Sequence, residues 1–369
     1  MRIAMLGTRG VPARYGGFET AVEEIGRRLA NRGHKVTVFC RDANLVPSPY
    51  LGMELVHLPS VRHKVAETLS HTALSVLHHA ARSADAAILF NAANAAFLPV
   101  LRAANVPTAL HVDGLEWRRS KWGSVGRRYY LVNERLAVKW AQVLIADAKG
   151  IQDYYRQTYR ADSVYIAYGA PVVVSPALSR LADVGLSRQS YHLVVARFEP
   201  ENHVHLALEG YVQSGGAFPL VVVGSAPYSE DYVRSIRAVG DQHPNILMLG
   251  PIWDQEFLNA LYAGSLTYIH GHSVGGTNPS LLRAMGAGAP VAAFDVNFNR
   301  EVLGPAGTYW KDAADLALLI QQAEQRPDEA AKRGVLGNLH VVRHYNWDSV
   351  SDDYEALCRT LIAQRRRRS

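Results

Sequence analysis

Short apolar runs alternate with segments of helical periodicity along most of the chain. Residues 18–31 form one helix candidate, because Phe18, Val22, Ile25 and Leu29 fall on one face at a spacing of three to four residues. Strands that alternate with helices are typical of a parallel α/β sheet. The predicted strands of the first half lie at residues 3–6, 36–40, 54–58, 86–90, 109–112 and 143–146.

The alternation lapses after Pro171 and resumes near residue 193. Strands of a second series are predicted at residues 193–196, 220–223, 246–249, 266–269 and 291–294. We therefore predict two Rossmann-like, doubly wound α/β domains, over residues 1–170 and 190–348, with a linker at 171–190. A final amphipathic helix over residues 349–364 is expected to pack back on the first domain. Because ligands bind at the carboxyl ends of parallel strands, the active site is expected in a cleft between the two facing domains.

The composition argues against a membrane-spanning protein, a secreted protein and a disulfide- or zinc-stabilised protein. No apolar run approaches the about 18–20 residues that a membrane-spanning helix needs. The apolar stretch before Arg9 is too short for a secretory signal, so a cytoplasmic location is expected. Cys40 and Cys358 are far apart and lack metal or redox spacing, which argues against a disulfide scaffold or a structural zinc site.

Charge is divided unevenly along the chain. Residues 1–170 hold 22 Lys and Arg against 13 Asp and Glu, whereas the remainder holds 17 against 20. A basic half suits an anionic partner, which leaves nucleic acid, a phosphorylated substrate and an anionic membrane. The stretch 118–139 interleaves seven Lys and Arg with Trp and Tyr, as an anionic membrane interface requires, although an ordinary helix with a solvated basic face fits equally. No recognition-helix, zinc-finger or RNP pattern accompanies it, so we expect no nucleic-acid partner.

The loop after the first strand carries the first candidate site. Gly7, Gly10, Gly16 and Gly17 lack the spacing of a dinucleotide fingerprint, but adjacent glycines at a helix N-terminus let backbone N–H groups approach an anion. A tight strand–helix turn needs only Gly7. The loop also contains Arg9, Arg14 and Tyr15, which favours a ligand-binding loop.

The loop sequence resembles a bacterial branch of the family 4 glycosyltransferases that includes rhamnosyltransferases of surface-polysaccharide assembly. The matching blocks run in order from Gly7 to Thr20, from His111 to Lys121-Trp122, from Ala196 to Asn202, from Gly271 to Leu282 and from Asn299 to Val302. The resemblance implies the GT-B fold and metal-independent transfer from a nucleotide sugar with retention of configuration. It also implies a cytoplasmic enzyme that is peripheral on the inner face of the membrane.

Without a metal, cations and helix dipoles must neutralise the diphosphate leaving group. The resemblance places Arg197 at this task, and Asn202 stands where many relatives have Lys. Gly16, Gly17 and Arg9 are expected to supplement this donor site from the first domain. A surface ion pair with Glu199 or Glu201 is the structural alternative for Arg197.

The donor-binding segment of the family is usually written E-x7-E, and this chain has Gly275 and Arg283 at the two positions. Arg has no acceptor for the ribose hydroxyls, so either the donor or its pose is unusual or the activity is reduced. The structural alternative is that Arg283 turns outward and pairs with a phosphate or carboxylate. The rest of the segment is expected to bind the diphosphate at a helix N-terminus capped by Asn278 or Ser280. The donor-binding residues of this segment are Gly276, Thr277, Asn278, Ser280, Leu281 and Arg283.

His111, Asp113 and Glu116 follow a predicted strand of the first domain. The resemblance implies that His111 touches the donor sugar, and the two carboxylates are candidates for orienting or deprotonating the acceptor. A satisfied structural histidine is the alternative for His111. We expect Arg14, Tyr15, Trp117 and Arg118 to bind the acceptor.

These features predict a retaining glycosyltransferase that transfers a sugar, rhamnose from dTDP-rhamnose by resemblance, to a lipid-linked or other saccharide acceptor. Its partners are a nucleotide sugar, the acceptor and an anionic membrane surface, and no metal or other cofactor is expected. Two alternatives stay open: a nucleotide-sugar epimerase on the same fold, and a degenerate, non-catalytic nucleotide-sugar-binding protein suggested by Asn202 and Arg283.

Overall fold

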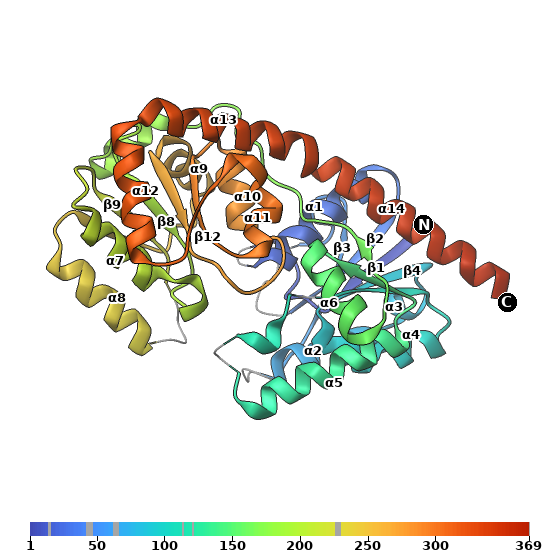
Figure 1. Ribbon diagram of the computed structural model, residues 1–369. Helices are drawn as coiled ribbons and strands as arrows, with labels where there is room; N and C mark the ends of the chain where they lie inside the picture. The colour runs from blue at the N-terminus through green and yellow to red at the C-terminus, as the bar shows by residue number, and fades with distance from the viewer. Residues whose placement is uncertain are drawn as a thin grey trace. The chain divides into compact units, whose positions relative to one another are not determined.

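The computed structural model describes residues 1–13, 16–41, 47–61, 66–112, 114–119, 122–225 and 230–368. Its contacts divide the chain into two units, each of which is a parallel sheet covered by helices (Figure 1). Unit 1 contains Met1–Tyr168 and Trp347–Ser369, and unit 2 contains Gly169–Asn346.

Unit 1 contains a seven-stranded sheet with the order β3-β2-β1-β4-β5-β6-β7. Its strands are β1 (Arg2–Leu6), β2 (Lys35–Arg41), β3 (Glu54–Leu58), β4 (Ala86–Phe90), β5 (Thr108–His111), β6 (Val143–Ala146) and β7 (Val164–Tyr165). Its described helices are α1 (Gly17–Asn31), α2 (Ala66–Leu77), α3 (His79–Arg82), α4 (Leu98–Ala103), α5 (Ser124–Trp140), α6 (Lys149–Tyr159) and α14 (Trp347–Arg368), with the 3-10 helices η1 (Ala92–Phe97) and η2 (Glu116–Arg118). The order reverses at β1, which pairs with both β2 and β4.

Unit 2 repeats this plan with the six-stranded order β10-β9-β8-β11-β12-β13. Its strands are β8 (His192–Val195), β9 (Leu220–Val223), β10 (Ile246–Gly250), β11 (Thr267–His270), β12 (Val291–Phe294) and β13 (Thr308–Trp310). Its described helices are α7 (Val204–Ser214), α8 (Glu230–Gln242), α9 (Gln255–Gly264), α10 (Pro279–Gly286), α11 (Asn297–Leu303), α12 (Ala313–Gln325) and α13 (Pro327–His344), with η3 (Leu178–Val184), η4 (Pro200–Asn202) and η5 (Gly304–Ala306). Here the order reverses at β8, which pairs with β9 and β11.

The eleven strands predicted from apolar runs are confirmed within one or two residues, and so is the doubly wound α/β class. Buried parallel strands read as continuous apolar runs, which makes them visible in a sequence. Strands β7 and β13 were not predicted, because they are only two and three residues long and lie at sheet edges.

Residues 171–190, for which the sequence indicates a linker, pack on unit 2. The N–H of Val173 donates to the carbonyl of Gly286 (3.0 Å), and the N–H of Gln189 donates to that of Gly264 (2.7 Å). Between them η3 buries Leu181 against Gly264, where an added Cβ would lie 2.6 Å from the leucine side chain. The serines and prolines of this segment therefore indicated irregular backbone rather than a free connection.

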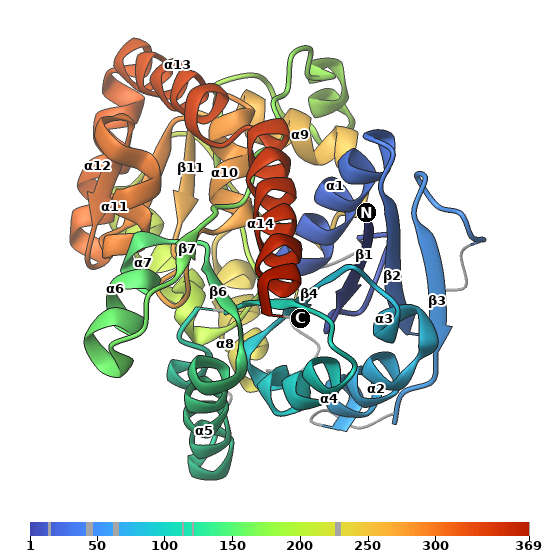
Figure 2. The same ribbon diagram turned by 90° about the vertical axis from the view of Figure 1, so that its right-hand side faces the viewer.

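Helix α14 joins the end of the chain to unit 1, where it lies beside α1 (Figure 2). Its buried face carries Val350, Tyr354, Leu357 and Leu361, at a spacing of three to four residues. No helix in the described ranges is both long and apolar enough to span a membrane.

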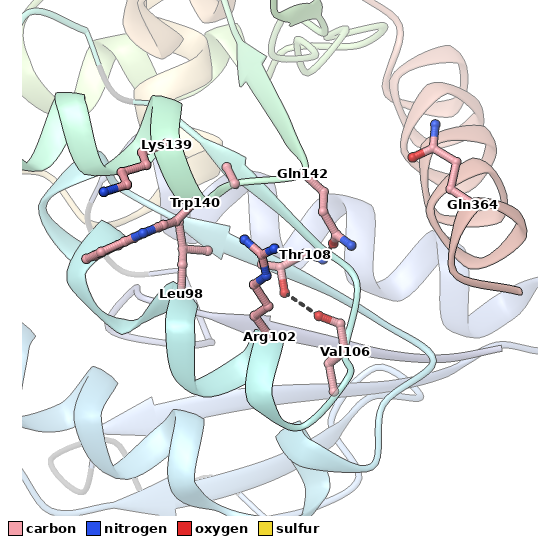
Figure 3. Close-up of a pocket in the computed structure, with 9 residues that line it drawn as sticks. Leu98, Arg102, Val106, Thr108, Lys139, Trp140, Gln142 and Gln364 are labelled. Atoms are coloured by element: carbon pink, nitrogen blue, oxygen red, sulfur yellow. Dashed lines mark hydrogen bonds between the residues drawn. The ribbon is translucent and has the colours of Figure 1, made fainter. Parts of the chain in front are cut away.

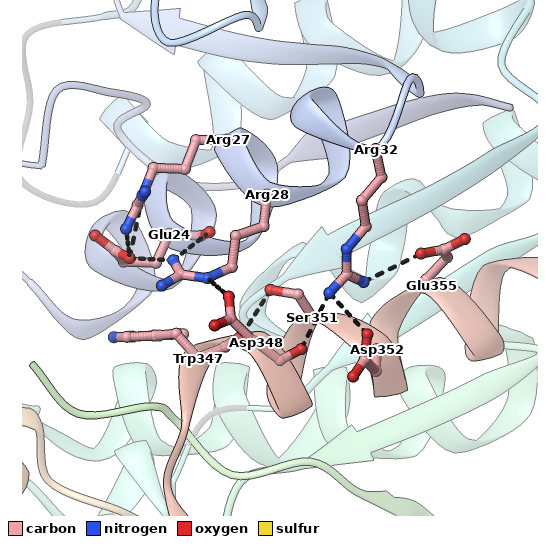
Figure 4. A network of polar contacts seen from close by, with 9 residues as sticks. All are labelled: Glu24, Arg27, Arg28, Arg32, Trp347, Asp348, Ser351, Asp352 and Glu355. Atoms are coloured by element: carbon pink, nitrogen blue, oxygen red, sulfur yellow. Dashed lines mark hydrogen bonds and ion pairs between the residues drawn. The ribbon is translucent and has the colours of Figure 1, made fainter. Parts of the chain in front are cut away.

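Two arginines, Arg28 in α1 and Arg32 just after its end, hold the first turns of α14 (Figure 4). Arg28 donates from Nε to Asp348 (2.6 Å) and also pairs with Glu24. Arg32 pairs with Asp352 (2.7 Å) and Glu355 (3.1 Å). Hydrogen bonds to Glu355 from Arg359 above all, and from His34 and Arg32, lower the pKa of this carboxyl to about 2. These charges form a network, which stabilises more than isolated surface pairs do.

We predict that Arg32→Ala loosens α14 without unfolding unit 1. Losing two ion pairs of a partly buried network costs about 1 kcal/mol, so exchange of the α14 amides in hydrogen-exchange mass spectrometry should rise about fivefold. Arg156→Ala is the control, because Arg156 pairs with Asp153 at the surface and both side chains are more than half exposed. Equal protection of α14 in wild type and Arg32→Ala would contradict the prediction.

Candidate functional site

The candidate donor site of unit 2 is built from two loops that follow adjacent strands. One loop follows β8 and includes Arg197 and η4, and the other follows β11 and leads into α10. Because β8 and β11 are neighbours at the reversal of strand order, their carboxyl ends lie side by side. Ligands of open α/β sheets bind at this point.

Side chains and backbone clasp the two loops together. The Nδ2 of Asn202 donates to the carbonyl of Arg197 (2.7 Å), and the Nδ1 of His272 donates to the Oδ1 of Asn202 (2.6 Å). Ser273 donates from its N–H to the carbonyl of Glu201 (3.0 Å). Gly271 permits this contact, since an added Cβ would lie 2.2 Å from the carbonyl oxygen of Asn202.

Asn202 is therefore committed to holding the loop. It stands where Lys is expected to contact phosphate, yet its amide nitrogen and oxygen both bond within the fold and its side chain is buried. The sequence predicted a missing charge here but not this role, nor the contributions of His272 and Asn299. Asn299 donates to the carbonyl of His272 (2.9 Å), and both residues follow strand ends, which was the available signal.

The backbone of Arg197 is held in place because its carbonyl accepts the hydrogen bond from Asn202. Its side chain is about one third exposed (34%), and its guanidinium lies 3.7 Å from Glu199. This pair is the structural alternative considered for Arg197. At 3.7 Å this contact is an ion pair rather than an N–H···O hydrogen bond, which is normally 2.7–3.2 Å long.

The N-terminus of α10 has the predicted cap. Asn278 Oδ1 accepts from the backbone N–H of Ser280 (2.9 Å) and from its hydroxyl (2.7 Å). Tyr268 of β11 donates to the Ser280 hydroxyl (3.3 Å), which ties the cap to the sheet. Gly276 is partly exposed and Thr277 is buried in the loop before the cap. Leu281 turns its side chain into the core, so only its backbone is available to a donor.

Arg283 lies one turn further along α10 and reaches α9. Its Nη2 donates to Oε1 of Gln255 (2.5 Å), and burial lowers the pKa of its guanidinium. The guanidinium therefore has an amide partner from α9 where the sequence suggested a phosphate or carboxylate partner.

In unit 1 the same reversal of strand order places the loop after β1 beside the loop after β4. Gly7 has φ +93°, and an added Cβ would lie 2.4 Å from the carbonyl oxygen of Phe90. Asn94 donates to the carbonyls of both Gly7 (3.2 Å) and Phe90 (2.8 Å), which fixes the two loops. A glycine is therefore needed at position 7 because the two loops pack too closely for a Cβ atom.

The rest of this loop surrounds the start of α1. Gly16 has φ +113° and precedes the first helical residue, Gly17. The Glu19 carboxylate accepts from the N–H of Arg9 (3.1 Å), and burial raises its pKa. The Arg9 side chain is exposed. Arg14 and Tyr15 lie outside the described residues.

His111 ends β5 and is buried in an aromatic cluster. Its ring stacks on Phe90 (5.6 Å between centroids) and Tyr168 (5.8 Å), and Phe18 meets it edge-on (5.1 Å). Its Nδ1 donates to the carbonyl of Val112 (3.1 Å). Burial lowers its pKa to about 4, so the ring is neutral at pH 7 and Nε2 carries a lone pair.

Glu116 and its neighbours form a braced turn at η2. The Glu116 carboxylate pairs with Arg119 (2.6 Å) and accepts from the indole of Trp122 (3.3 Å). Arg118 lies over the Trp117 ring at 5.2 Å. Glu116 is thus a buried anchor of the turn, whereas Trp117 and Arg118 present the more exposed surface.

Asp113 lies outside the described residues. In the described part of the chain, no three His, Cys, Asp or Glu side chains lie together as a metal site requires.

A buried neutral histidine makes stability depend on pH. Burial lowers the pKa of His270, at the end of β11, to about 3, below the about 6.5 of the unfolded chain. Only the unfolded state then gains a proton as the pH falls through 6.5, so stability drops, by about 2 kcal/mol per such residue between pH 7 and pH 5. We predict that His270→Gln removes about this much of the acid destabilisation measured by urea unfolding. The exposed His79→Gln is the control, and an equal acid effect in wild type and His270→Gln would contradict the prediction.

Two family models match separate parts of the chain. Residues 183–335 match the family model of glycosyl transferases group 1, and residues 89–171 match a domain of unknown function, DUF1972. No curated protein matches the sequence significantly.

Solved structures resemble the chain over almost its whole length. Sucrose-phosphate synthase from Thermosynechococcus elongatus is 20% identical, with a TM-score of 0.84 over 98% of this chain and 99% of that one. HepE from Anabaena, in complex with UDP-glucose, is 17% identical, with a TM-score of 0.79 over 96% and 98%. A trehalose-phosphate synthase from Burkholderia vietnamiensis is 12% identical, with a TM-score of 0.72 over 97% and 99%. Residues 183–335 thus form a glycosyl transferases group 1 domain, in a chain with the GT-B fold of glycosyltransferases.

Proposed function

We propose that this protein is a retaining, family 4 glycosyltransferase that moves a hexose from a nucleotide sugar to a saccharide acceptor. The observation that carries the proposal is the pair of clasped loops in the group 1 domain. They hold Arg197 and the capped N-terminus of α10 at adjacent strand ends, where a diphosphate is neutralised without a metal.

The proposed donor is dTDP-rhamnose, on the sequence resemblance to rhamnosyltransferases. The structural neighbour HepE has been crystallised with UDP and with UDP-glucose, which supports a nucleotide diphosphate as the leaving group and keeps UDP sugars as candidates. The proposed roles of Gly276 and Thr277 are to bring backbone N–H groups close to this diphosphate.

The proposed reaction is a front-face displacement. The bond from the anomeric carbon to the diphosphate oxygen breaks while the acceptor oxygen bonds to that carbon on the same face. The acceptor proton passes to the departing phosphate oxygen, so configuration is retained. A neutral His111 suits this chemistry, because an imidazole lone pair accepts a hydrogen bond from a sugar hydroxyl and adds no charge.

The proposed acceptor is a lipid-linked saccharide of cell-surface polysaccharide synthesis, bound by Trp117 and Arg118 of unit 1. Helix α5 supports an anionic membrane surface as a partner. Its exposed face carries Arg128, Val132 and Arg135, which recur at helical spacing. Attraction of such a face to anionic lipids adds about 1 kcal/mol per cation.

A non-catalytic nucleotide-sugar-binding protein is the second candidate, favoured by the inward-turned Asn202 and by Arg283. Purified protein incubated with UDP-, dTDP- and GDP-sugars and a lipid-linked acceptor separates the two. The proposal expects a glycosylated product whose anomeric configuration, read by NMR, matches that of the donor. Donor binding in a thermal-shift assay without transfer or hydrolysis of any donor would favour the second candidate.

We predict that Arg197→Ala reduces transfer at least a hundredfold and leaves the melting temperature near that of wild type. The partly exposed side chain contributes little to packing, while one charge on the leaving group is worth about 3 kcal/mol in the transition state. Arg234→Ala, which removes an exposed arginine of α8, is the control. Turnover of Arg197→Ala within a few-fold of wild type would exclude the proposed role.

We predict that Arg283→Glu strengthens nucleotide binding about ten- to a hundredfold for each new ribose hydrogen bond, and therefore strengthens UDP binding more than dTDP binding. A carboxylate accepts hydrogen bonds from both ribose hydroxyls of UDP, whereas dTDP has only the 3′-hydroxyl, and each such bond is worth about 1.5–3 kcal/mol. Calorimetry with UDP, dTDP and GDP measures the effect, and Gln255→Ala controls for loss of the present partner. Weaker binding of all three would assign Arg283 to the diphosphate, and unchanged binding would place it outside the donor site.

A further inference from the structure

A pocket lies in unit 1 at the amino-terminal edge of its sheet (Figure 3). It opens where α4 and α5 end and β5 begins, and α14 supplies Gln364 at its far side. Its volume is about 190 Å³. The loop after β1 and His111 lie at the carboxyl ends of the parallel strands, which is the opposite edge, so this pocket is separate from the site described above.

The charged groups of this pocket are both cationic hydrogen-bond donors. Arg102 and Lys139 contribute a guanidinium and an ammonium, and among the described residues no Asp or Glu lines the pocket. The Oε1 of Gln142 accepts from the N–H of Thr108 (2.5 Å), so the amide nitrogen is left on the other side as a donor. The half-buried indole of Trp140 forms part of the wall.

The two cations are not needed to cap the helices on which they lie. Val100, Leu101 and Arg102 already have their carbonyls bonded to the N–H groups of the turn that follows α4. At the end of α5, the carbonyl of Ala137 accepts from the N–H of Ala141. Within the described ranges, no carboxylate pairs with Arg102 or Lys139, both of which are exposed. Their charges are thus available to a ligand.

The pocket also continues the basic face of α5. Arg128, Val132, Arg135 and Lys139 follow one another at spacings of four, three and four residues, so they share one side of the helix. Val132 is 44% exposed and Val125, one turn before Arg128, is 83% exposed. A stripe of cations and bare aliphatic side chains therefore leads from the start of α5 into the pocket.

We propose that this pocket binds a phosphate ester, presented as the headgroup of an anionic phospholipid at the surface that the α5 stripe contacts. The inference rests on the membrane association included in the proposed function. Guanidinium, ammonium and amide donors match the oxygens of a phosphate, and a volume of about 190 Å³ holds that group with a small alcohol. Drug-sized ligands need about 300–1,000 Å³, so a whole nucleotide sugar is too large.

The test compares two double variants that remove the same charge from α5 and its surroundings. Arg102→Gln with Lys139→Gln empties the pocket of cations, and Arg128→Gln with Arg135→Gln removes two cations from the stripe alone. Cosedimentation with phosphatidylcholine vesicles, with and without phosphatidylglycerol, reports the lipid source. Calorimetry with glycerol 3-phosphate reports the same chemistry in solution. Circular dichroism confirms that each variant is folded.

The proposal expects binding to the anionic vesicles alone. The stripe variant should lose about thirtyfold in vesicle affinity, because it removes two cations worth about 1 kcal/mol each. The pocket variant should lose about tenfold more than that, because its cations bond directly to phosphate. Only the pocket variant should lose the ability to bind glycerol 3-phosphate.

Three results would overturn all or part of it. If both variants lose the same amount of vesicle affinity, the pocket is not a lipid-binding site, and the proposed membrane association still holds. If the wild-type protein binds glycerol 3-phosphate but not vesicles, the pocket is a phosphate-ester site. The ligand is then not a membrane lipid, and the membrane part of the proposed function is wrong. Wild-type protein that binds neither would overturn the site outright.

Discussion

The parallel direction of the strands is the constraint on which both units depend. When every strand runs the same way, all carboxyl-terminal loops meet at one edge, and the reversal of strand order leaves two of them side by side. In unit 2 this brings Arg197 and the cap of α10 together, and in unit 1 it brings Gly7 beside Phe90. The glycines at these points are required by backbone approach, since Gly271 and Gly7 leave no space for a Cβ.

The polar groups at the strand ends divide into those that hold the loops and those that remain available to a ligand. Asn202, His272 and Asn299 form hydrogen bonds with each other and with backbone carbonyls, which fixes the two loops relative to each other. Such rigidity is what electrostatic stabilisation requires, because a charge that is already in place needs no reorganisation during the reaction. A positively charged Lys at position 202 would have lacked the acceptor that His272 uses here.

Unit 1 combines two edges with different chemistry. Its carboxyl edge holds aromatic and buried groups around His111, where desolvation keeps the ring neutral. Its amino edge is basic, from Arg102 and Lys139 to the α5 stripe. Helix α14, held by Arg28 and Arg32, carries the end of the chain across unit 1 and completes the pocket with Gln364. The uneven charge of the sequence thus has a local counterpart on one helix and one edge of the sheet.

The sequence by itself determined the elements whose signal is local. Buried strands appear in the sequence as apolar runs. Helix α1 appears as apolar residues at a spacing of three to four, and the cap of α10 appears as Asn before Pro. The blocks that resemble glycosyltransferases also predicted a site at the ends of particular strands, which stays a prediction. Only the tertiary structure decided how residues far apart in the chain use one another. It showed that residues 171–190 pack on α9 and α10, that Asn202 is held by His272, that Glu116 is neutralised by Arg119, and that α4, α5 and α14 enclose a pocket. The physical reason is that a side chain's partner is set by the packing of whole elements, whereas periodicity and capping depend only on residues within a few positions of each other.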